Sequence, residues 1–236
     1  METAFPPATA TQKPEFRRVQ VFTGGEGGYA NYRCPALVRT ARGTLLLSPD
    51  ARNTRSDWGW IDLLLSRSTD GGRTWSPSQV ISRWDGEPSP NSVSDSARRG
   101  GDGPARKPSG RITFSNQCLI PDADGRVHLI YFVEYCRAMY RVSEDDGVTW
   151  SDPVEITASA FEPYRAEYPW KVIAAGPGAG IQISRGPHKG RLVAQSWMSR
   201  GGAEAGSDHR PSNTGTIYSD DGGRTWLPGA ITARHG

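Results

Sequence analysis

The sequence contains little cysteine and no long apolar run. Its three cysteines, Cys34, Cys118 and Cys136, are an odd number without metal-ligand spacing, which favours free thiols over a disulfide framework. No stretch is long enough and apolar enough to cross a membrane. The first residues also lack the basic start and the following apolar run of a signal peptide, so the compartment stays open between the cytoplasm, which we favour, and a truncated export form.

The sequence also lacks a large excess of charge of either sign. The formal net charge is +3, and no long block of like charge occurs. We therefore expect no nucleic-acid partner, whereas a small anionic ligand remains open. Nothing in the sequence implies a metal or a cofactor. The 236 residues suffice for a sizeable core, and one all-β domain can account for all of them.

Three copies of one eight-residue stretch, which we call the box, organise the chain. Each copy reads Ser-x-Asp-x-Gly-x-Thr-Trp, and the copies are 68–75, 143–150 and 219–226. Their nearly constant spacing is typical of a repeat architecture. Ser and Asp can hydrogen-bond the backbone of a tight turn and Gly supplies its positive φ, so each box predicts a strand-turn-strand element. We expect the box Trp to wedge between neighbouring sheets.

A calcium loop is the alternative interpretation of the box, because Asp-x-Gly also occurs in cation-binding loops. Such a loop of the EF-hand type needs alternating oxygen ligands and a closing Glu. None of the three copies has them, which favours the structural interpretation.

Apolar, β-rich runs around the boxes divide the chain into three units of four strands. The expected strands are 34–40, 44–48 and 61–67, then 116–120, 127–133 and 138–143, then 180–184, 192–197 and 215–219, with a fourth strand from each box Trp. Four antiparallel strands per unit are the construction of a propeller blade. The predicted blades are approximately 29–82, 112–157 and 172–230. Residues 1–15 are expected to be a flexible lead-in, 16–22 a short strand, and 83–111 a polar surface loop.

The up-and-down topology of a blade separates two faces. Because the boxes join strands three and four, Asp70, Asp145 and Asp221 are predicted at one end of the blades. The starts of the first strands and the loops between strands two and three lie at the other end. The candidate site residues that we place there are Arg33, Arg52, Asp57, Asn116, Glu134, Arg137, Gln182, His209 and Arg210.

Several motifs at that end resemble the exo-α-sialidase (neuraminidase) family, whose propellers carry Asp-box (BNR) repeats. Tyr32-Arg33-Cys34-Pro35 is similar to the family's Tyr-Arg-Ile-Pro motif, and the Ser-Asp step at 56–57 precedes Ile61-Asp62 and a box as it does in the family. Asn116-Gln117-Cys118 and the stretch 176–182 are similar to the openings of the family's second and third blades. Together these motifs cover the chain from about Tyr29 to its end.

The resemblance implies a six-bladed propeller, of which about three blades are present, and an exo-α-sialidase that cleaves terminal sialic acids from glycoconjugates. It implies that Arg33 is one of three arginines that clamp the sialic acid carboxylate, since a planar guanidinium binds a carboxylate through two parallel hydrogen bonds. Asp57 matches the catalytic acid/base, and Arg52 a further substrate-side arginine. Asn116 and Gln182 are also substrate-binding candidates.

Each candidate also has a structural interpretation. Arg33 suits an ion pair and Asp57 a loop cap, while Asn116 and Gln182 suit backbone-satisfying roles. Glu134 and Arg137 suit a pair with each other. Arg33 and Asp57 at family spacing ahead of a box favour the functional interpretation when they are taken together.

The resemblance also implies groups that this chain does not show. The family's nucleophilic Tyr, the Glu that activates it and the other two clamp arginines belong to later blades. We therefore expect the chain alone to be inactive and a second propeller half to be a partner, beside sialylated glycoconjugates or free sialic acid. The alternative function is a noncatalytic Asp-box propeller that binds glycan or protein. Arg33 with Asp57 favours the enzyme, because a scaffold needs neither.

Overall fold

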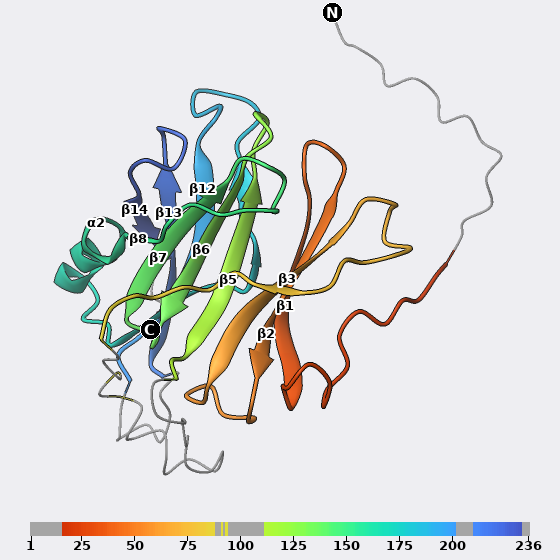
Figure 1. Ribbon diagram of the computed structural model, residues 1–236. Coiled ribbons are helices and arrows are strands. Elements are labelled where there is room, and N and C mark those ends of the chain that lie inside the picture. The colour runs from red at the N-terminus through yellow and green to blue at the C-terminus, as the bar shows by residue number, and fades with distance from the viewer. Residues whose placement is uncertain (1–15, 88–90, 92, 94–110, 202–209, 233–236) are drawn as a thin grey trace, which may run out of the picture.

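Three sheets stand side by side in chain order in the computed structural model, which describes residues 16–87, 91, 93, 111–201 and 210–232 (Figure 1). The first sheet contains β1 (Asn31–Arg39), β2 (Leu45–Arg52), β3 (Ile61–Ser68) and β4 (Gln79–Val80), and the second contains β5 (Phe114–Pro121), β6 (Val127–Val133), β7 (Arg137–Ser143) and β8 (Val154–Glu155). The third contains β9 (Val172–Ala175), β11 (Ile181–Gln182), β12 (Leu192–Ser199), β13 (Ser212–Ser219) and β14 (Leu227–Ile231). Neighbouring strands within each sheet pair antiparallel, and both β9 and β11 pair with β12.

The all-β prediction and the meander of each unit are therefore confirmed. Helical structure among the described residues is confined to one short segment, α2 (Thr157–Ala160) followed by η1 (Glu162–Ala166). No helix there is long and apolar enough to span a membrane. The exact limits of the three units remain a prediction.

Two strand predictions are wrong. Residues 16–22 form no strand. The first strand of the third unit does not begin near Gly180 but at Val172, and it is split into two pieces. The first piece, β9, pairs with the C-terminal half of β12, and the second, β11, pairs with the N-terminal end of β12. Between them, β10 (Gly178–Ala179) leaves the third sheet and pairs parallel with β5. Pro177 lacks the N–H that a continuous ladder needs, which is consistent with the interruption.

The three boxes share one hydrogen-bond pattern. In the second box, Gly147 N donates to Ser143 Oγ over 2.8 Å, Ser143 Oγ donates to Asp145 Oδ1, and Thr149 N donates to the same carboxylate oxygen. The first and third boxes repeat these three bonds. The box therefore closes the turn through its Ser and Asp, as its sequence predicts. The fourth strands begin after the Trp rather than at it.

Each of the second and third boxes docks on the preceding sheet. Side chains of the first sheet donate to backbone carbonyls of the second box: Gln79 Nε2 to Gly147 O over 2.7 Å and Arg67 Nε to Asp146 O over 2.9 Å. The third box lies against the second sheet, where the ring centroids of Trp226 and Tyr140 are 5.7 Å apart. The boxes thus fasten neighbouring sheets to one another.

The box tryptophans differ in burial. Trp226 is fully buried, Trp150 is partly buried against the core between the first two sheets, and Trp75 is partly buried with its indole N–H bonded to Gly72 O in its own box. We expected all three box tryptophans to wedge between neighbouring sheets, but only Trp226 is fully buried.

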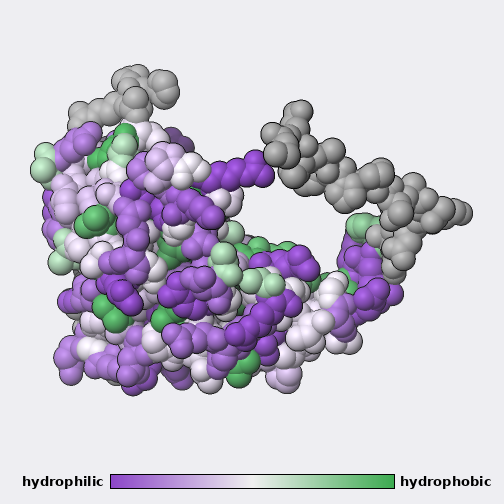
Figure 2. Space-filling view, turned by 90° about the horizontal axis from the view of Figure 1, so that it is seen from above, coloured by the Kyte–Doolittle hydropathy of each residue, from purple (hydrophilic) through white to green (hydrophobic). Residues whose placement is uncertain are grey.

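The second sheet supplies side chains to two hydrophobic cores. Leu129 and Tyr131 of β6 pack with residues of the first sheet, whereas Ile130 and Phe132 of the same strand pack with residues of the third sheet and its preceding helical segment. Because side chains alternate along a strand, one strand serves both cores. The face of the molecule seen in Figure 2 is mostly hydrophilic, and its hydrophobic residues are scattered.

The register places the boxes and the predicted site at opposite ends of the first sheet. Leu45 pairs with Ser68 at the box end of β2 and β3, and Arg52 pairs with Ile61 at the other end. The two-face prediction is thus confirmed for this sheet. For Gln182 it is wrong, because this residue pairs with Leu192, which in turn pairs with Ser219 at the start of the third box.

Candidate functional site

A pocket of about 340 Å³ lies at the end opposite to the boxes, where the three sheets meet. Its lining residues come from all three sheets: Arg33, Cys34, Arg52 and Asp57, then Asn116 and Tyr135, then Ala174, Ala175, Gly176, Pro177, Gln195 and Trp197. Of the five residues that we predicted for catalysis or substrate binding, four are therefore brought together: Arg33, Arg52, Asp57 and Asn116.

The other candidates lie elsewhere. The Gln182 side chain accepts from Ala123 N and donates to Gly190 O. Glu134 accepts from Thr113 N, and Arg137 pairs with Glu155 over 3.1 Å rather than with Glu134. Arg210 is exposed and does not line the pocket, and His209 lies outside the described residues.

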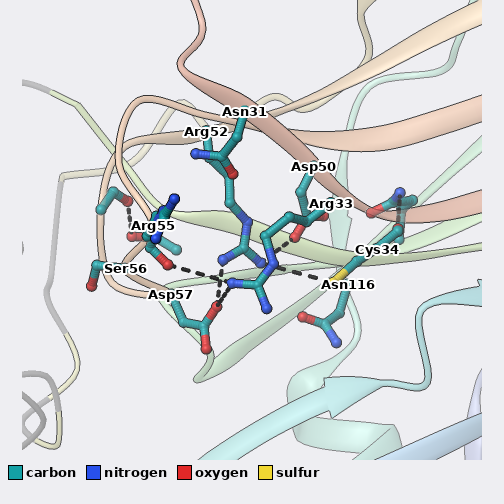
Figure 3. Close-up of polar contacts among 12 residues, drawn as sticks. Asn31, Arg33, Cys34, Asp50, Arg52, Arg55, Ser56, Asp57 and Asn116 are labelled. Carbon is teal, nitrogen blue, oxygen red and sulfur yellow. Dashed lines mark hydrogen bonds and ion pairs between the residues drawn. The ribbon is translucent and has the colours of Figure 1, made fainter. Parts of the chain in front are cut away.

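Arg52 is held between two carboxylates under the pocket. Asp50 and Arg52 are two positions apart on β2, so their side chains point to the same face of the strand. Arg52 Nη2 donates to Asp50 Oδ2 over 2.7 Å, and Arg52 Nη1 donates to Asp57 Oδ1 (Figure 3). The side chain of Arg52 is only 1% exposed and that of Asp50 is fully buried. One guanidinium thus joins a buried carboxylate to one at the pocket wall.

Arg33 and Asp57 face each other at the pocket mouth. The side chain of Arg33 is 52% exposed, and its Nη1 lies 3.8 Å from Asp57 Oδ1 and 3.4 Å from the carbonyl oxygen of Arg55. In Figure 3 both arginines approach the same oxygen of Asp57, and the other oxygen points away from them. Arg33 is therefore the accessible cation of the site.

Three residues that line the pocket have a backbone conformation that favours glycine. The φ angles of Cys34, Asn116 and Tyr135 are 49°, 52° and 51°. Cys34 and Asn116 lie at irregularities in the β1–β2 and β5–β6 registers. Such bulges re-aim side chains, and backbone strain of this kind clusters at functional sites. Here the bulges lie where the first strands of two sheets reach the pocket.

Burial changes the acidity of groups around the pocket. Burial raises the pKa of Asp50 to about 6, although the neighbouring Arg52 acts in the opposite direction. Burial, followed by the charges of Asp57 and Asp50, raises the pKa of Tyr135 well above its usual range. Burial also raises the pKa of the Cys34 thiol. Tyr135 and Cys34 are therefore neutral walls of the pocket at neutral pH.

Among the site residues that were not predicted are Asp50, Tyr135, Gln195 and Trp197. Asp50 had a readable signal, because its spacing from Arg52 puts both on one strand face. Tyr135 lies in the turn between β6 and β7, and Gln195 and Trp197 lie within β12, so only the packing of three sheets brings them to the pocket. No local pattern marks them.

The chemistry of this arrangement is that of an anion site beside a carboxyl group. An accessible guanidinium can bind a carboxylate through two parallel hydrogen bonds. Asp57, within 4 Å of it, can give or take a proton at a ligand bound there. Among the residues that the structure describes, no group of three or more His, Cys, Asp or Glu side chains could hold a metal ion.

Comparison with known proteins identifies what the chain is similar to. The family model of the BNR/Asp-box repeat matches residues 66–77. A sialidase of Micromonospora viridifaciens is 34% identical over 224 residues, which are 92% of this chain and 32% of that protein. A sialidase of Bacteroides fragilis is 30% identical over 220 residues, which are 88% of this chain and 36% of that protein.

The fold is also that of solved sialidases. The Hadza microbial sialidase Hz136 matches with a TM-score of 0.67 and 26% identity, over 89% of this chain and 39% of that one. An intramolecular trans-sialidase of Ruminococcus gnavus shares the fold with a TM-score of 0.63 at 17% identity, over 89% of this chain and 62% of that one.

The chain spans about a third of the length of these two curated relatives. Its three sheets are accordingly blades of a sialidase-type propeller, and the Asp-box pattern recurs in each of them. The similarity to sialidases extends over nearly all of this sequence, and it relates the chain to one part of those longer proteins.

Proposed function

We propose that these blades supply part of the active site of an exo-α-sialidase, a glycoside hydrolase that removes terminal sialic acids from glycoconjugates. The observation that carries the proposal is the pair at the pocket mouth, where the exposed guanidinium of Arg33 lies beside the carboxyl group of Asp57. Arg33 binds the carboxylate of the substrate, and Asp57 is the acid/base. Arg52 and Asn116 form the wall beside them.

The two roles support each other physically. A substrate carboxylate that binds Arg33 competes with Asp57 for the same guanidinium. Its negative charge also favours the protonated form of Asp57, because like charges at short range oppose ionisation. Substrate binding thus prepares Asp57 to protonate the leaving glycosidic oxygen and later to activate water.

The substrate class rests on the relatives and on the geometry together. A Trypanosoma rangeli sialidase that shares the fold, with a TM-score of 0.53 and 19% identity over 85% of this chain, has been solved in complex with sialic acid. We propose sialylated glycoconjugates or free sialic acid as ligands of this chain, because the site offers a fork-shaped cation to an anionic sugar.

Catalysis in this proposal needs further blades. The nucleophilic Tyr and its Glu belong to the later part of the family's propeller, and this chain spans only a third of its relatives. The chain alone therefore binds sialic acid weakly and does not turn over a sialoside, since one arginine-carboxylate pair open to water contributes only modestly. A second propeller half supplies the missing groups and closes the pocket.

Binding tests the role of Arg33 without catalysis. We expect N-acetylneuraminic acid to shift resonances of the pocket residues in NMR titrations of the chain, and its methyl ester, which lacks the charge, to bind several-fold more weakly. Arg33→Gln should abolish this preference for the acid. Arg185→Gln, which removes an exposed arginine outside the pocket, is the matched control and should keep it. Equal binding of acid and ester by the unchanged chain would contradict the proposal.

Turnover tests the role of Asp57. The chain joined to the remaining blades of a related sialidase should hydrolyse sialosides. There Asp57→Asn should slow substrates with poor leaving groups much more than aryl sialosides, whose leaving group needs little protonation. A noncatalytic propeller would bind the acid but show no hydrolysis in this assembly.

A further inference from the structure

Asp50 is a buried carboxylate for which the proposed function has so far given no role. Its side chain is fully buried, and it does not line the pocket. Its Oδ2 accepts from Arg52 Nη2 over 2.7 Å. Its Oδ1 is buried and has no hydrogen-bond partner among the described residues. The backbone N–H of Asn116 also faces this carboxyl group and lowers its pKa, while Arg52 is its charged partner. The ionised carboxylate therefore depends on Arg52 for the compensation of its charge.

Arg52 depends on Asp50 in turn. Only 1% of its side chain is exposed, so water does not compensate its charge. Its Nε has no partner among the described groups, while Nη2 donates to Asp50 and Nη1 to Asp57. Because a guanidinium is planar and rigid, fixing one Nη group fixes the direction of the other. Asp50 therefore sets the direction in which Arg52 presents Nη1 to Asp57.

We propose that Asp50 is a positioning residue that acts through Arg52 to hold Asp57 at the pocket mouth and to limit the positive charge that Asp57 experiences. This inference rests on the proposed function, because it concerns the acid/base of that same site. It gives Arg52 the support of Asp57 as a role in addition to its place in the pocket wall.

The consequence of losing Asp50 follows from the charges. Breaking a buried ion pair leaves the other partner uncompensated, and that partner then seeks another counter-charge. Asp57 is the carboxylate within reach of Arg52. With both Nη groups drawn to it, Asp57 moves away from Arg33 and is held as the carboxylate, which makes it a poorer acid.

The groups that face this network come from three elements. Arg33 and Cys34 belong to β1, Arg52 to β2, and Tyr135 to the turn between β6 and β7. Since Cys34 and Tyr135 are neutral at neutral pH, the charged members of this network that act on Asp57 are Arg33, Arg52 and Asp50.

A structural experiment tests the coupling without any enzymatic activity. In the isotope-labelled chain, we expect the Arg52 guanidinium to show restricted rotation, with its two Nη groups resolved by NMR. Asp50→Asn should change the Arg52 signals and also the carboxyl signal of Asp57. Asp50→Glu, which keeps the charge, should restore part of the pattern. Unchanged Asp57 signals in a folded Asp50→Asn chain would overturn the inference.

A kinetic experiment tests the consequence for the proposed reaction. In the assembly with the remaining blades, Asp50→Asn should lower the hydrolysis rate of a sialoside with a poor leaving group by about tenfold, and that of an aryl sialoside much less. The alkaline limb of the pH–rate profile should move to lower pH, because Asp57 then holds its proton less well. Asp50→Glu should restore part of both.

The control variant is Asp122→Asn. Asp122 is also a buried carboxylate with an arginine partner, Arg126 over 2.7 Å, but it lies in the turn between β5 and β6, outside the pocket. The variant Asp122→Asn should leave the substrate selectivity and the pH–rate profile unchanged. An equal effect of Asp50→Asn on both substrates, with no shift of the profile, would mean a structural role only. If no assembly hydrolyses sialosides, the proposed function fails, while the Asp57 carboxyl signal in Asp50→Asn still decides whether Asp50 positions Asp57.

Discussion

Arg52 carries a full positive charge with almost no exposure to solvent. Such a residue persists because both of its neighbours are carboxylates, and the truncation of either one leaves an uncompensated charge. The Tyr-Arg and Ser-Asp steps of the sequence predicted Arg33 and Asp57. Asp50 was not predicted, because its role depends on burial, which the sequence of β2 alone does not state. Gln182 was misplaced because the break in the first strand of the third sheet was not recognised.

The buried Asp50 gives the stability of the chain a specific pH dependence. Burial raises its pKa to about 6, above the value of an unfolded Asp, so the folded state binds more protons between about pH 4 and pH 6. The contribution of this group to stability is therefore fully present below pH 4 and is lost as the pH rises through 6. We expect the difference in unfolding free energy between the unchanged chain and Asp50→Asn to shrink over this range in denaturant titrations.

That comparison needs Asp57→Asn as its control, because this variant also removes a partner of Arg52 but keeps Asp50 titratable. A difference that stays constant from pH 4 to pH 7 would show that Arg52 compensates the Asp50 charge more strongly than burial opposes it.

The box is the element whose sequence specified its structure most completely. Its Ser, Asp and Gly form a closed local network, so no distant contact is needed to explain the turn. The fourth strands and the split first strand were predicted less well. Their limits depend on which neighbouring strand offers hydrogen bonds, as the pairing of β10 with the second sheet shows.

Glycine-to-alanine changes at the equivalent position of each box should separate turn geometry from docking. Gly72, Gly147 and Gly223 have similar φ angles of 87°, 82° and 90°, so alanine costs about 1–2 kcal/mol in each turn. A methyl group on Gly72 would lie 3.5 Å from Leu45, and one on Gly147 would lie 3.2 Å from Leu46 of the preceding sheet. On Gly223 it would collide with the Tyr140 hydroxyl group.

The loss of stability in chemical denaturation should therefore increase from Gly72→Ala to Gly147→Ala to Gly223→Ala. Tyr140→Phe removes the hydroxyl group and should reduce the effect at Gly223 specifically. Equal losses at all three positions would mean that the turn conformation alone decides the cost.

At the scale of the whole molecule, the second sheet is the common centre. Every residue of β6 is buried, whereas β1 and β14 expose several positions. The order of the three sheets was predictable from the repeat, but the double role of β6 was not. A mostly apolar strand is compatible with any arrangement that covers both of its faces.

Hydrogen exchange should reflect this centre. We expect backbone amides of β6 to exchange most slowly in mass-spectrometric measurements on the chain, and those of β14 to exchange much faster, because local opening is easier where fewer apolar contacts are lost. Adding the remaining blades should slow exchange in β1 and β14 and leave β6 nearly unchanged. Uniform protection of all strands in the chain alone would contradict a single stable centre.

The docking of each box on the sheet before it has a consequence for how such chains can grow. One unit carries the turn that attaches it to its predecessor and also the side chains, such as Arg67 and Gln79 in the first unit, that receive the turn of its successor. A duplicated unit therefore carries both contact surfaces that neighbouring units need for packing. A chain that is lengthened by whole units therefore requires no new type of interface. The pocket, in contrast, is lined by residues from different units, so each added unit contributes further lining residues.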